Sequence, residues 1–377
     1  MDTLIYNGNL ILPDGIKKTN LGIRKGKIAY LGDKKVPAKK EIDAKGKFVS
    51  PGFIDLHCHG MGGCLFEDET EEAFEKIGKT AAHFGVTTML AGLTASHIEE
   101  RVKETVKIIR KLKNSGSQAN IAGIYLEGPF INPSERGSLL IAERPSLKML
   151  DNIIKTAKGL PLVVVVAPEI TFGWDAIAKL KKNKIVASIG HSDATYDEAK
   201  KGFEMGIENA THLFNAMRGF HHREPGVVGA VLDSKKITAE LVLDGYHSNP
   251  SCARLVNKVL GIERLIFITD STSAAGTKDN YTRVYDGQGA IIKNGAPMVG
   301  NRLAGSILTL DRAVKNFIKW TNVPLEEAIL PATLNPAKKI GLEKQKGSLE
   351  IGKDADIIIF DRNIKIEKTL VAGEICK

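Results

Sequence analysis

Cysteine is scarce in this sequence. The 377 residues include four, which are Cys58, Cys64, Cys252 and Cys376. No two of them have the Cys-x-x-Cys spacing of a redox motif or a zinc ribbon, and four thiols are too few for a disulfide framework. The scarcity excludes the small disulfide-stabilised secreted proteins and is typical of the reduced cytoplasm, where we place this protein.

Long apolar runs are absent as well. No run reaches the roughly 18 residues that a membrane-spanning helix requires. The first seven residues have the pattern of a strand rather than that of a signal peptide. We therefore expect no membrane partner.

Concentrated positive charge is the third absence. Lys and Arg total 53 against 44 Asp and Glu, which gives a formal net charge of +9. The lysines are scattered, however, and no arginine-rich block or basic patch interleaved with aromatic residues occurs. Because nucleic-acid binding needs such a patch, we expect none, whereas an anionic small molecule is compatible with the charge.

Both ends of the chain are rich in short strands and turns. Near the N-terminus the strands are separated by turn-forming pairs, namely Asn7-Gly8, Asp14-Gly15 and Lys25-Gly26. Apolar segments at 355–361 and 368–373 repeat this pattern. Neither set is large enough to bury a core alone. We predict that residues 1–50 and 345–377 pair into one small β-sandwich module.

Between these ends, eight short apolar runs alternate with stretches of helical periodicity. The runs are 49–56, 86–93, 121–126, 162–167, 185–189, 209–213, 237–243 and 265–269. Apolar strands with helical crossovers indicate a parallel sheet that is covered on both faces. Eight such units predict a (β/α)8 TIM barrel over residues 51–344. An open doubly wound sheet is the alternative, but no Gly-x-Gly-x-x-Gly follows the first run.

Polar residues end many of these runs, where a barrel keeps its active site. The residues with metal-ligand chemistry are His57, His59, Glu127, His191, His212 and Asp270. Alternate residues of a strand face the same side, about 6.5 Å apart. His57 and His59 can therefore converge on one ion. Imidazole and carboxylate ligands suit Zn, Fe, Mn or Co, so we predict a divalent-metal hydrolase.

Other residues with reactive side chains have simpler interpretations. His83 and His97 lie in or beside predicted helices, and we expect them to pack or to face solvent. Cys58 should face the barrel wall, and Cys64 in its glycine-rich loop should be a buried residue. Asp55 is expected to support His57 or to be a structural hydrogen-bonding group.

The motifs of the chain resemble, in order, those of a known enzyme family. Pro-Gly-Phe-Ile-Asp-Leu-His-Cys-His-Gly at 51–60 resembles the first-strand motif of the amidohydrolase superfamily. Further segments resemble the N-acetylglucosamine-6-phosphate deacetylase family: Leu-Glu-Gly-Pro-Phe at 126–130, Gly-His-Ser at 190–192, Thr-His-Leu-Phe-Asn-Ala-Met at 211–217, Arg-Glu-Pro-Gly at 223–226, Asp-Gly-Tyr-His at 244–247, Thr-Asp-Ser at 269–271 and Leu-Ala-Gly-Ser at 303–306. This resemblance spans nearly the whole chain.

The resemblance implies a metal centre. Its principal ion would be held by Glu127, His191 and His212. Some members of the family hold a second ion through a His-x-His pair, which this sequence keeps as His57 and His59. One or two ions per subunit are thus implied, and Glu127 or Asp270 would help to bind the second.

The resemblance also implies the substrate side of the site. Asp270 matches the catalytic acid and base, and His247 matches a residue that lines the sugar site. The backbone amides of Asn215 and Ala216 would meet the sugar phosphate. Two further substrate contacts are implied. Leu303 would line the substrate site, and Arg223 would reach the phosphate from the neighbouring subunit of a homodimer.

One position departs from the family pattern. The family usually has a histidine that touches the sugar in the segment after its Glu-Gly-Pro motif, and here Leu139 stands at that place. Leucine cannot hydrogen-bond a hydroxyl group, and a lost polar contact can reduce discrimination between substrates. The departure leaves the metal residues untouched but puts the identity of the hexosamine in doubt.

The activity implied is metal-dependent hydrolysis of the N-acetyl group of N-acetylglucosamine 6-phosphate. Three alternatives stay open: deacetylation of N-acetylgalactosamine 6-phosphate, hydrolysis of a cyclic amide as in dihydroorotase relatives, and non-catalytic binding of a sugar phosphate by a sensor barrel. Asn215, Arg223 and His247 argue against the cyclic amide. The complete set of ligand-type residues, together with Asp270, argues against the sensor.

Overall fold

The apolar runs in the middle of the chain form one parallel sheet in the computed structural model, which describes residues 1–94, 96–112, 117–140 and 144–377. Eight strands pair in chain order: β6 (Phe53–Asp55), β9 (Val86–Thr94), β10 (Asn120–Glu127), β11 (Leu162–Val166), β12 (Val186–Ile189), β13 (Ile207–Ala210), β14 (Thr238–Val242) and β15 (Leu265–Ile268). β9, β11, β12 and β15 are buried along their whole length, as in a parallel sheet covered on both faces.

The segments that follow the first and last strands of this sheet lie side by side. Cys58 forms a parallel bridge with Ser271. The Asp270 N–H donates to the His57 carbonyl over 2.8 Å, and the His59 N–H donates to the Ser271 carbonyl over 2.9 Å. The strands thus have the arrangement of a TIM-barrel-type fold, as predicted.

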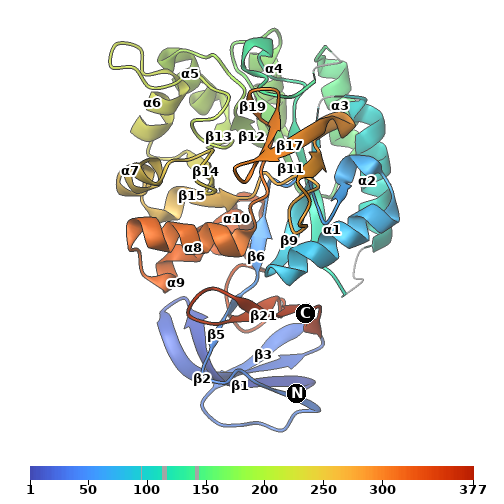
Figure 1. Ribbon diagram of the computed structural model, residues 1–377, viewed down its shortest axis with the longest axis vertical. Coiled ribbons are helices and arrows are strands. Elements are labelled where there is room, and N and C mark those ends of the chain that lie inside the picture. The colour runs from blue at the N-terminus through green and yellow to red at the C-terminus, as the bar shows by residue number, and fades with distance from the viewer. Residues whose placement is uncertain (95, 113–116, 141–143) are drawn as a thin grey trace.

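Helices surround this sheet (Figure 1). They are α1 (Glu71–His83), α2 (Ile98–Leu112), α3 (Leu147–Thr156), α4 (Gly173–Lys182), α5 (Tyr196–Met205), α6 (Gly226–Asp233), α7 (Pro250–Leu260), α8 (Leu310–Thr321), α9 (Leu325–Ala328) and α10 (Leu334–Lys339), with 3-10 turns η1 (Phe66–Asp68), η2 (Pro133–Glu135), η3 (Ile262–Arg264), η4 (Tyr285–Gly287) and η5 (Leu330–Ala332). Thr195 and Glu198 form a capping box at the start of α5. Among the described residues, no helix is long and apolar enough to cross a membrane.

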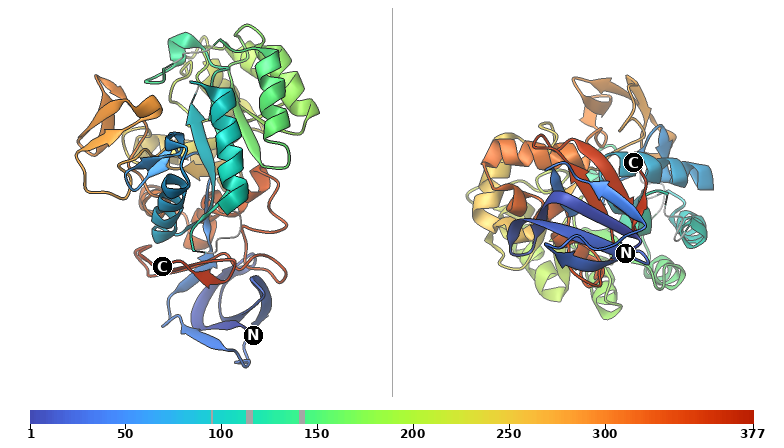
Figure 2. Two further views of the ribbon diagram at one scale, coloured as in Figure 1. Left: turned by 90° about the vertical axis from the view of Figure 1, so that its right-hand side faces the viewer. Right: turned by 90° about the horizontal axis from the view of Figure 1, so that it is seen from below.

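Strands from both chain ends pair below the barrel (Figure 2). They are β1 (Thr3–Leu12), β2 (Gly15–Arg24), β3 (Lys27–Gly32), β4 (Lys40–Asp43), β5 (Phe48–Pro51), β20 (Ile357–Phe360), β21 (Ile366–Val371) and β22 (Glu374–Ile375). All eight belong to one mixed sheet with an apolar cluster of its own. The pairing of the two ends is confirmed, whereas the sandwich form and the boundaries at 50 and 345 stay predictions.

Three details differ from the sequence predictions. Asn7 and Gly8 are not a hairpin turn but an irregularity inside β1, where the register with β2 shifts. The first apolar run is two strands, β5 in the small sheet and β6 in the barrel, divided at Gly52, where a Cβ would lie 2.1 Å from the Thr87 side chain. The run at 209–213 ends early, because β13 stops at Ala210 and the chain then turns.

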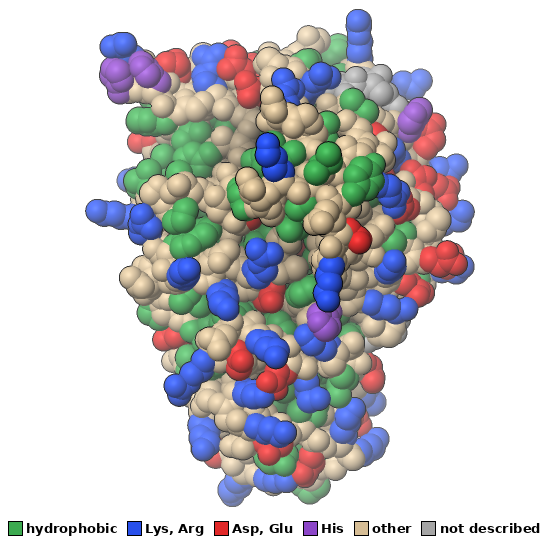
Figure 3. All heavy atoms as spheres, viewed as in Figure 1, with side chains coloured by type: hydrophobic (Ala, Val, Ile, Leu, Met, Phe, Trp, Pro, Cys, Tyr) green, Lys and Arg blue, Asp and Glu red, His purple; other side chains and the backbone are tan. Residues whose placement is uncertain are grey.

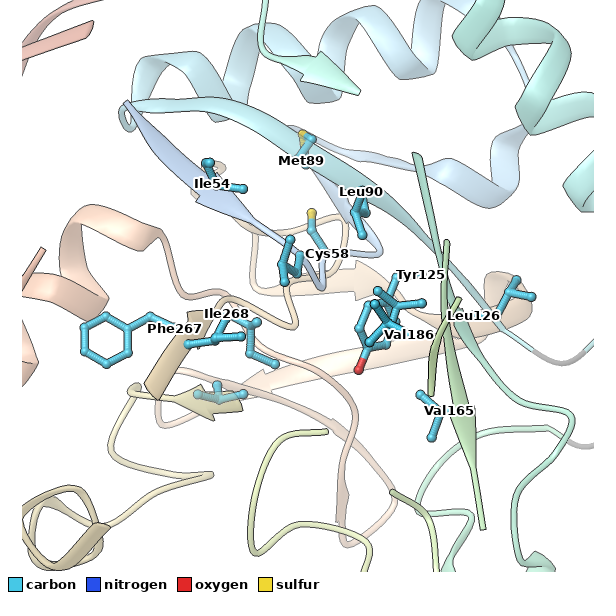
Figure 4. Close-up of a cluster of buried hydrophobic side chains, with 14 of the residues drawn as sticks. Ile54, Cys58, Met89, Leu90, Tyr125, Leu126, Val165, Val186, Phe267 and Ile268 are labelled. Atoms are coloured by element: carbon cyan, nitrogen blue, oxygen red, sulfur yellow. The ribbon is translucent and has the colours of Figure 1, made fainter. Parts of the chain in front are cut away.

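Hydrophobic side chains from several strands of the barrel sheet pack into a buried cluster. Figure 4 shows Cys58, Leu90, Tyr125 and Val165 among them, drawn from four successive parts of the sheet. Cys58 is fully buried there, with its sulfur 3.2 Å from the Ser271 hydroxyl. This confirms that Cys58 faces the barrel wall rather than the metal-ligand side.

An insertion follows β15 and forms a separate small sheet. Its strands are β16 (Tyr281–Arg283), β17 (Gly289–Lys293), β18 (Ala296–Val299) and β19 (Arg302–Leu303), all antiparallel. A further pair, β7 (Gly60–Met61) and β8 (Cys64–Leu65), follows β6. Both features come directly after barrel strands that carry ligand-type residues, so both lie beside the candidate site.

Candidate metal centre

Three ligand-type side chains from different strand ends meet at one point. Glu127 ends β10, and His191 and His212 follow β12 and β13. The Glu127 Oε1 atom lies 2.9 Å from His191 Nε2 and 3.0 Å from His212 Nε2. These three residues are at most 4% exposed. The structure thus brings together the three residues predicted for the principal ion.

A second group lies directly beside the first. The Nε2 atoms of His57 and His59 are 3.0 Å apart, and Asp270 Oδ1 lies 3.4 Å from His59 Nε2. Glu127 joins the two groups, because its Oε2 atom is 3.1 Å from His59 Nε2 while its Oε1 atom faces the first group. Glu127, one of the three residues of the first group, therefore also faces the three residues of the second.

Left-handed backbone conformations turn three of these side chains into the site. The φ angles are 48° at His191, 28° at His212 and 47° at Asp270. Such values are uncommon outside glycine and cost about 1–3 kcal/mol each. Backbone hydrogen bonds hold Asp270 in this state, since its N–H donates to His57 and its carbonyl accepts from the Ser306 N–H over 2.7 Å. Strain of this kind concentrates at functional sites.

Two carboxylates lie in this buried centre. Burial alone would raise the pKa of Glu127, but the charge of His57 and hydrogen bonds from His191 and His212 outweigh it and hold that pKa well below its usual range. Burial opposes ionisation of Asp270 in the same way, yet the neighbouring His59 ring and the charge of His57 lower the pKa. Both groups are thus ionised at neutral pH and favour a bound cation.

The donor set fits a divalent metal ion. Glu127 Oε2 and Asp270 Oδ1 are buried oxygens with no hydrogen-bond donor among the described residues. Imidazole nitrogens face each other at 3.0 Å in one group and at 3.2 Å in the other. Nitrogens bound to one zinc ion at about 2.0–2.1 Å in a tetrahedron lie about 3.3 Å apart, so this is the spacing of metal ligands.

Residues behind the ligands orient them. The His191 Nδ1 atom lies 2.8 Å from the Glu135 carbonyl oxygen. Because a carbonyl can only accept a hydrogen bond, the ring proton lies on Nδ1, and Nε2 is left free for a metal. The His57 ring stacks on Tyr125 with centroids 4.1 Å apart. Tyr125 in turn donates to Glu240 Oε2 over 2.9 Å. Glu240 and its partner Asn209 are fully buried in the barrel and were not identified from the sequence, because neither follows the end of an apolar run.

Asp55 has a structural role. Its carboxylate accepts hydrogen bonds from the Thr269 hydroxyl over 2.6 Å and from the backbone N–H groups of Thr269 and His57 over 3.3 Å. Burial raises the pKa of Asp55 to about 6. The residue ties the end of β15 to the end of β6 and so supports His57 through its backbone.

The predicted phosphate loop has a distinctive backbone. Phe214 and Ala216 have φ angles of 83° and 48°. The Asn215 N–H donates to the His212 carbonyl over 3.0 Å and is therefore engaged within the loop. The Ala216 N–H has no acceptor among the described residues. Of the two amides, that of Ala216 is the one available to an anion.

The remaining predicted substrate residues lie in different settings. His247 has its Nδ1 atom 2.7 Å from Asp244, and its side chain is 5% exposed. Leu303 lies in β19 and is half-buried. Arg223 is exposed in the turn before α6 and has no ion-pair partner among the described residues. Leu139 is 2% exposed and belongs to the apolar core, so it offers no polar group to a ligand.

His83, His97 and Cys64 lie outside the two ligand groups, as expected. His83 and His97 are exposed, at the end of α1 and just before α2. Cys64 is half-buried in β8. Lys and Arg side chains are scattered over the face of the molecule shown in Figure 3 rather than gathered into one patch, as the sequence predicted.

Comparison with known proteins identifies the fold and the family. The model of the amidohydrolase family matches residues 48–376. The N-acetylglucosamine-6-phosphate deacetylase of Vibrio furnissii is 36% identical over 331 residues, which cover 87% of this chain and 82% of the relative. The N-acetylgalactosamine-6-phosphate deacetylase of Escherichia coli O157:H7 is 33% identical, with 89% of each chain covered.

A solved structure extends the similarity to three dimensions. The crystal structure of N-acetylglucosamine-6-phosphate deacetylase from Pasteurella multocida superposes with a TM-score of 0.92, at 31% identity and over 99% of each chain. The family match includes every ligand-type residue of the two groups described above. The chain belongs to the amidohydrolase family, and its relatives within that family include the amino-sugar-phosphate deacetylases.

Proposed function

We propose that this protein hydrolyses the N-acetyl group of N-acetylglucosamine 6-phosphate to give glucosamine 6-phosphate and acetate. The observation that supports it most is the pair of buried ligand groups that share Glu127, in a chain 36% identical to a deacetylase with this substrate in its name. Such a centre is suited to the hydrolysis of an unactivated amide. A divalent ion supplies a Lewis acid for the carbonyl oxygen and lowers the pKa of water towards about 7.

The residues of the chain provide the remaining chemistry. Asp270 is ionised, and its Oδ1 atom is buried without a hydrogen-bond donor among the described residues, so it can accept the proton of the attacking water. The same carboxyl group then passes that proton to the amine nitrogen when the C–N bond breaks. His247 is held by Asp244 with its Nε2 atom free to meet a sugar hydroxyl.

The phosphate of the substrate would bind away from the reacting amide. The free N–H of Ala216 is one donor, and Asn215 supplies the loop that presents it. Arg223 is exposed at the rim, and its planar fork pairs well with phosphate oxygens. We propose that the protein is a homodimer in which Arg223 reaches the site of the neighbouring subunit. Binding energy from the phosphate would then position the amide for attack.

The activity can be tested directly on purified protein. We expect acetate release from N-acetylglucosamine 6-phosphate that is abolished by a chelator and restored by Zn, Mn, Fe or Co. N-Acetylgalactosamine 6-phosphate is measured in parallel, because one relative bears that substrate's name and because Leu139 makes no polar contact. Turnover of the galactosamine isomer alone would replace the proposed substrate. Binding without turnover of either isomer would indicate a non-catalytic barrel.

The two ligand groups also predict a metal stoichiometry. We expect two ions per chain in the wild type and one in the His59→Asn variant, because His59 contacts both Glu127 and Asp270 in the second group. Metal content is measured by mass spectrometry after gel filtration. His83→Asn, a change at an exposed histidine on α1, is the control and should leave two ions. A single ion in the wild type that persists in His59→Asn would contradict a second site.

A further inference from the structure

The insertion after β15 places a tyrosine directly against the metal centre. Tyr285, in η4 between β16 and β17, packs edge-on against the His59 ring with centroids 4.8 Å apart and an interplanar angle of 83°. Its side chain is 5% exposed. It therefore lies in the wall of the site, next to a ligand-type residue.

The hydroxyl group of this tyrosine is available to a ligand. Among the described residues, none forms a hydrogen bond with it. A Cβ atom built on Gly305 would lie 3.0 Å from the Tyr285 hydroxyl oxygen and 2.8 Å from the Asp270 carbonyl oxygen. The hydroxyl is thus at the end of β15, beside the proposed acid and base, and glycine at 305 leaves it room.

Electrostatics keep this hydroxyl protonated. Burial, followed by the negative charges of Asp270 and Glu127, raises the pKa of Tyr285 well above its usual range. A neutral phenol is a hydrogen-bond donor, and no residue in the described part of the chain accepts a hydrogen bond from this one. A ligand oxygen in the site can accept that hydrogen bond.

Ion pairs hold the insertion in place. The Arg101 guanidinium, from α2, lies 2.8 Å from Glu67 and 2.9 Å from Asp286. The Asp286 N–H donates to Glu67 Oε2 over 2.6 Å, and Ser96 donates to Asp286 over 2.9 Å. Asp286 is the residue after Tyr285, so this network fixes the backbone that carries the tyrosine.

The insertion also contacts the segment in which the family histidine is missing. Arg302 donates to the Gly137 carbonyl over 2.7 Å, and Gln288 donates to the Ser138 carbonyl over 3.3 Å. Leu139 follows these residues and is buried in apolar surroundings. The same wall of the site therefore lacks a donor at 139 and has one at 285.

We propose that Tyr285 is a catalytic residue that donates a hydrogen bond to the carbonyl oxygen of the substrate's N-acetyl group. The role rests on the proposed deacetylase function. As the water oxygen bonds to the carbonyl carbon, the C=O π electrons move to the oxygen, and the Tyr285 O–H stabilises the charge that develops there. When the C=O bond reforms, the C–N bond breaks and the amine takes its proton from Asp270. Tyr285 keeps its own proton throughout.

The first test is Tyr285→Phe. Loss of one donor to a developing oxyanion lowers kcat by about 10²–10³-fold, and we expect that loss with KM and metal content close to wild type. Phenylalanine keeps the ring against His59, so packing is preserved. Tyr281→Phe is the matched control, because Tyr281 lies in β16 of the same insertion and is 60% exposed. We expect the control to match wild type.

The second test concerns Arg101 as a positioning residue. Arg101→Met should lower kcat in the wild-type background but much less in the Tyr285→Phe background, because the two changes would remove the same hydrogen bond. Arg101→Lys should restore part of the loss, since an ammonium group can still pair with Glu67. Additive losses in the double variant would show that Arg101 acts independently of Tyr285.

The outcomes separate this role from the activity itself. Acetate release by the wild type with an equally active Tyr285→Phe variant would overturn the role and leave the deacetylase function intact. A raised KM with unchanged kcat would also overturn it, because the hydroxyl would then contribute only to ground-state binding. No acetate release by the wild type would overturn the function and, with it, this role.

Discussion

Asp270→Asn is expected to lower kcat by about 10²–10⁴-fold, the contribution of a general acid and base, while the first ligand group retains its metal. Asparagine keeps the size of the side chain and tolerates the left-handed φ of 47° at this position. The backbone bonds of residue 270 to His57 and Ser306 remain. The change thus removes the proton acceptor with little effect on the fold, and acetate release under saturating substrate measures it.

A control at the same end of the barrel makes this result specific. Asp193→Asn changes a carboxylate that is 43% exposed and pairs with Arg218, outside both ligand groups. We expect wild-type kcat for that variant. Metal content below one ion per chain in Asp270→Asn would show that Asp270 acts mainly as a ligand. Full activity with full metal content would contradict its role as acid and base.

The metal centre could be predicted from the sequence because the ligand-type residues lie at or just after the ends of apolar runs. Glu127 ends β10, and His191 comes two residues after β12, as the alternating pattern predicted. In a parallel sheet the carboxyl ends of the strands share one edge, so residues far apart in the chain must meet there. The order and spacing of the apolar runs are therefore enough to place the metal ligands at one end of the barrel, but they do not give the distances between them.

The features that shape the site depend on contacts that no local pattern contains. The left-handed backbone at His191 and His212 could not be predicted, since only a few per cent of residues other than glycine adopt it. The insertion had a local signal, the Asn294-Gly295 pair, whose φ angles of 54° and 89° form the turn between β17 and β18. Its placement against His59 could not be predicted, because it requires Glu67, Arg101 and Asp286 to converge.

The same limit explains the division of the first apolar run. Residues 49–56 were predicted as one run, although Ser50, Pro51, Gly52 and Asp55 interrupt its apolar residues. The chain instead passes from the small sheet to the barrel at Gly52, whose N–H donates to the Asp356 carbonyl near the other chain end. The pairing of β5 with β20 from the other chain end shows that this run contributes one strand to the small sheet and one to the barrel sheet.

Glu127→Gln is expected to reduce bound metal to a small fraction of wild type and to lower kcat by more than about 10³-fold, because the chemistry requires the ion. Glutamine has the same shape but only one acceptor oxygen and no charge. A glutamine side chain therefore cannot accept from His191 and His212 through one oxygen and from His59 through the other. The histidines would then face each other at about 3 Å without a central anion or a cation to bridge them.

Metal content and acetate release on the same samples distinguish the possible causes of that loss. Glu169→Gln is the matched control, because Glu169 accepts hydrogen bonds from Asn132 and Ser192 beside His191 but faces neither ligand group. We expect it to keep both its metal and its activity. If Glu127→Gln binds as much metal as wild type and is equally active, Glu127 cannot be the shared ligand. If it binds metal normally but is inactive, the carboxylate acts on the substrate rather than on the ion, and the centre would have to be held by the histidines and Asp270 alone.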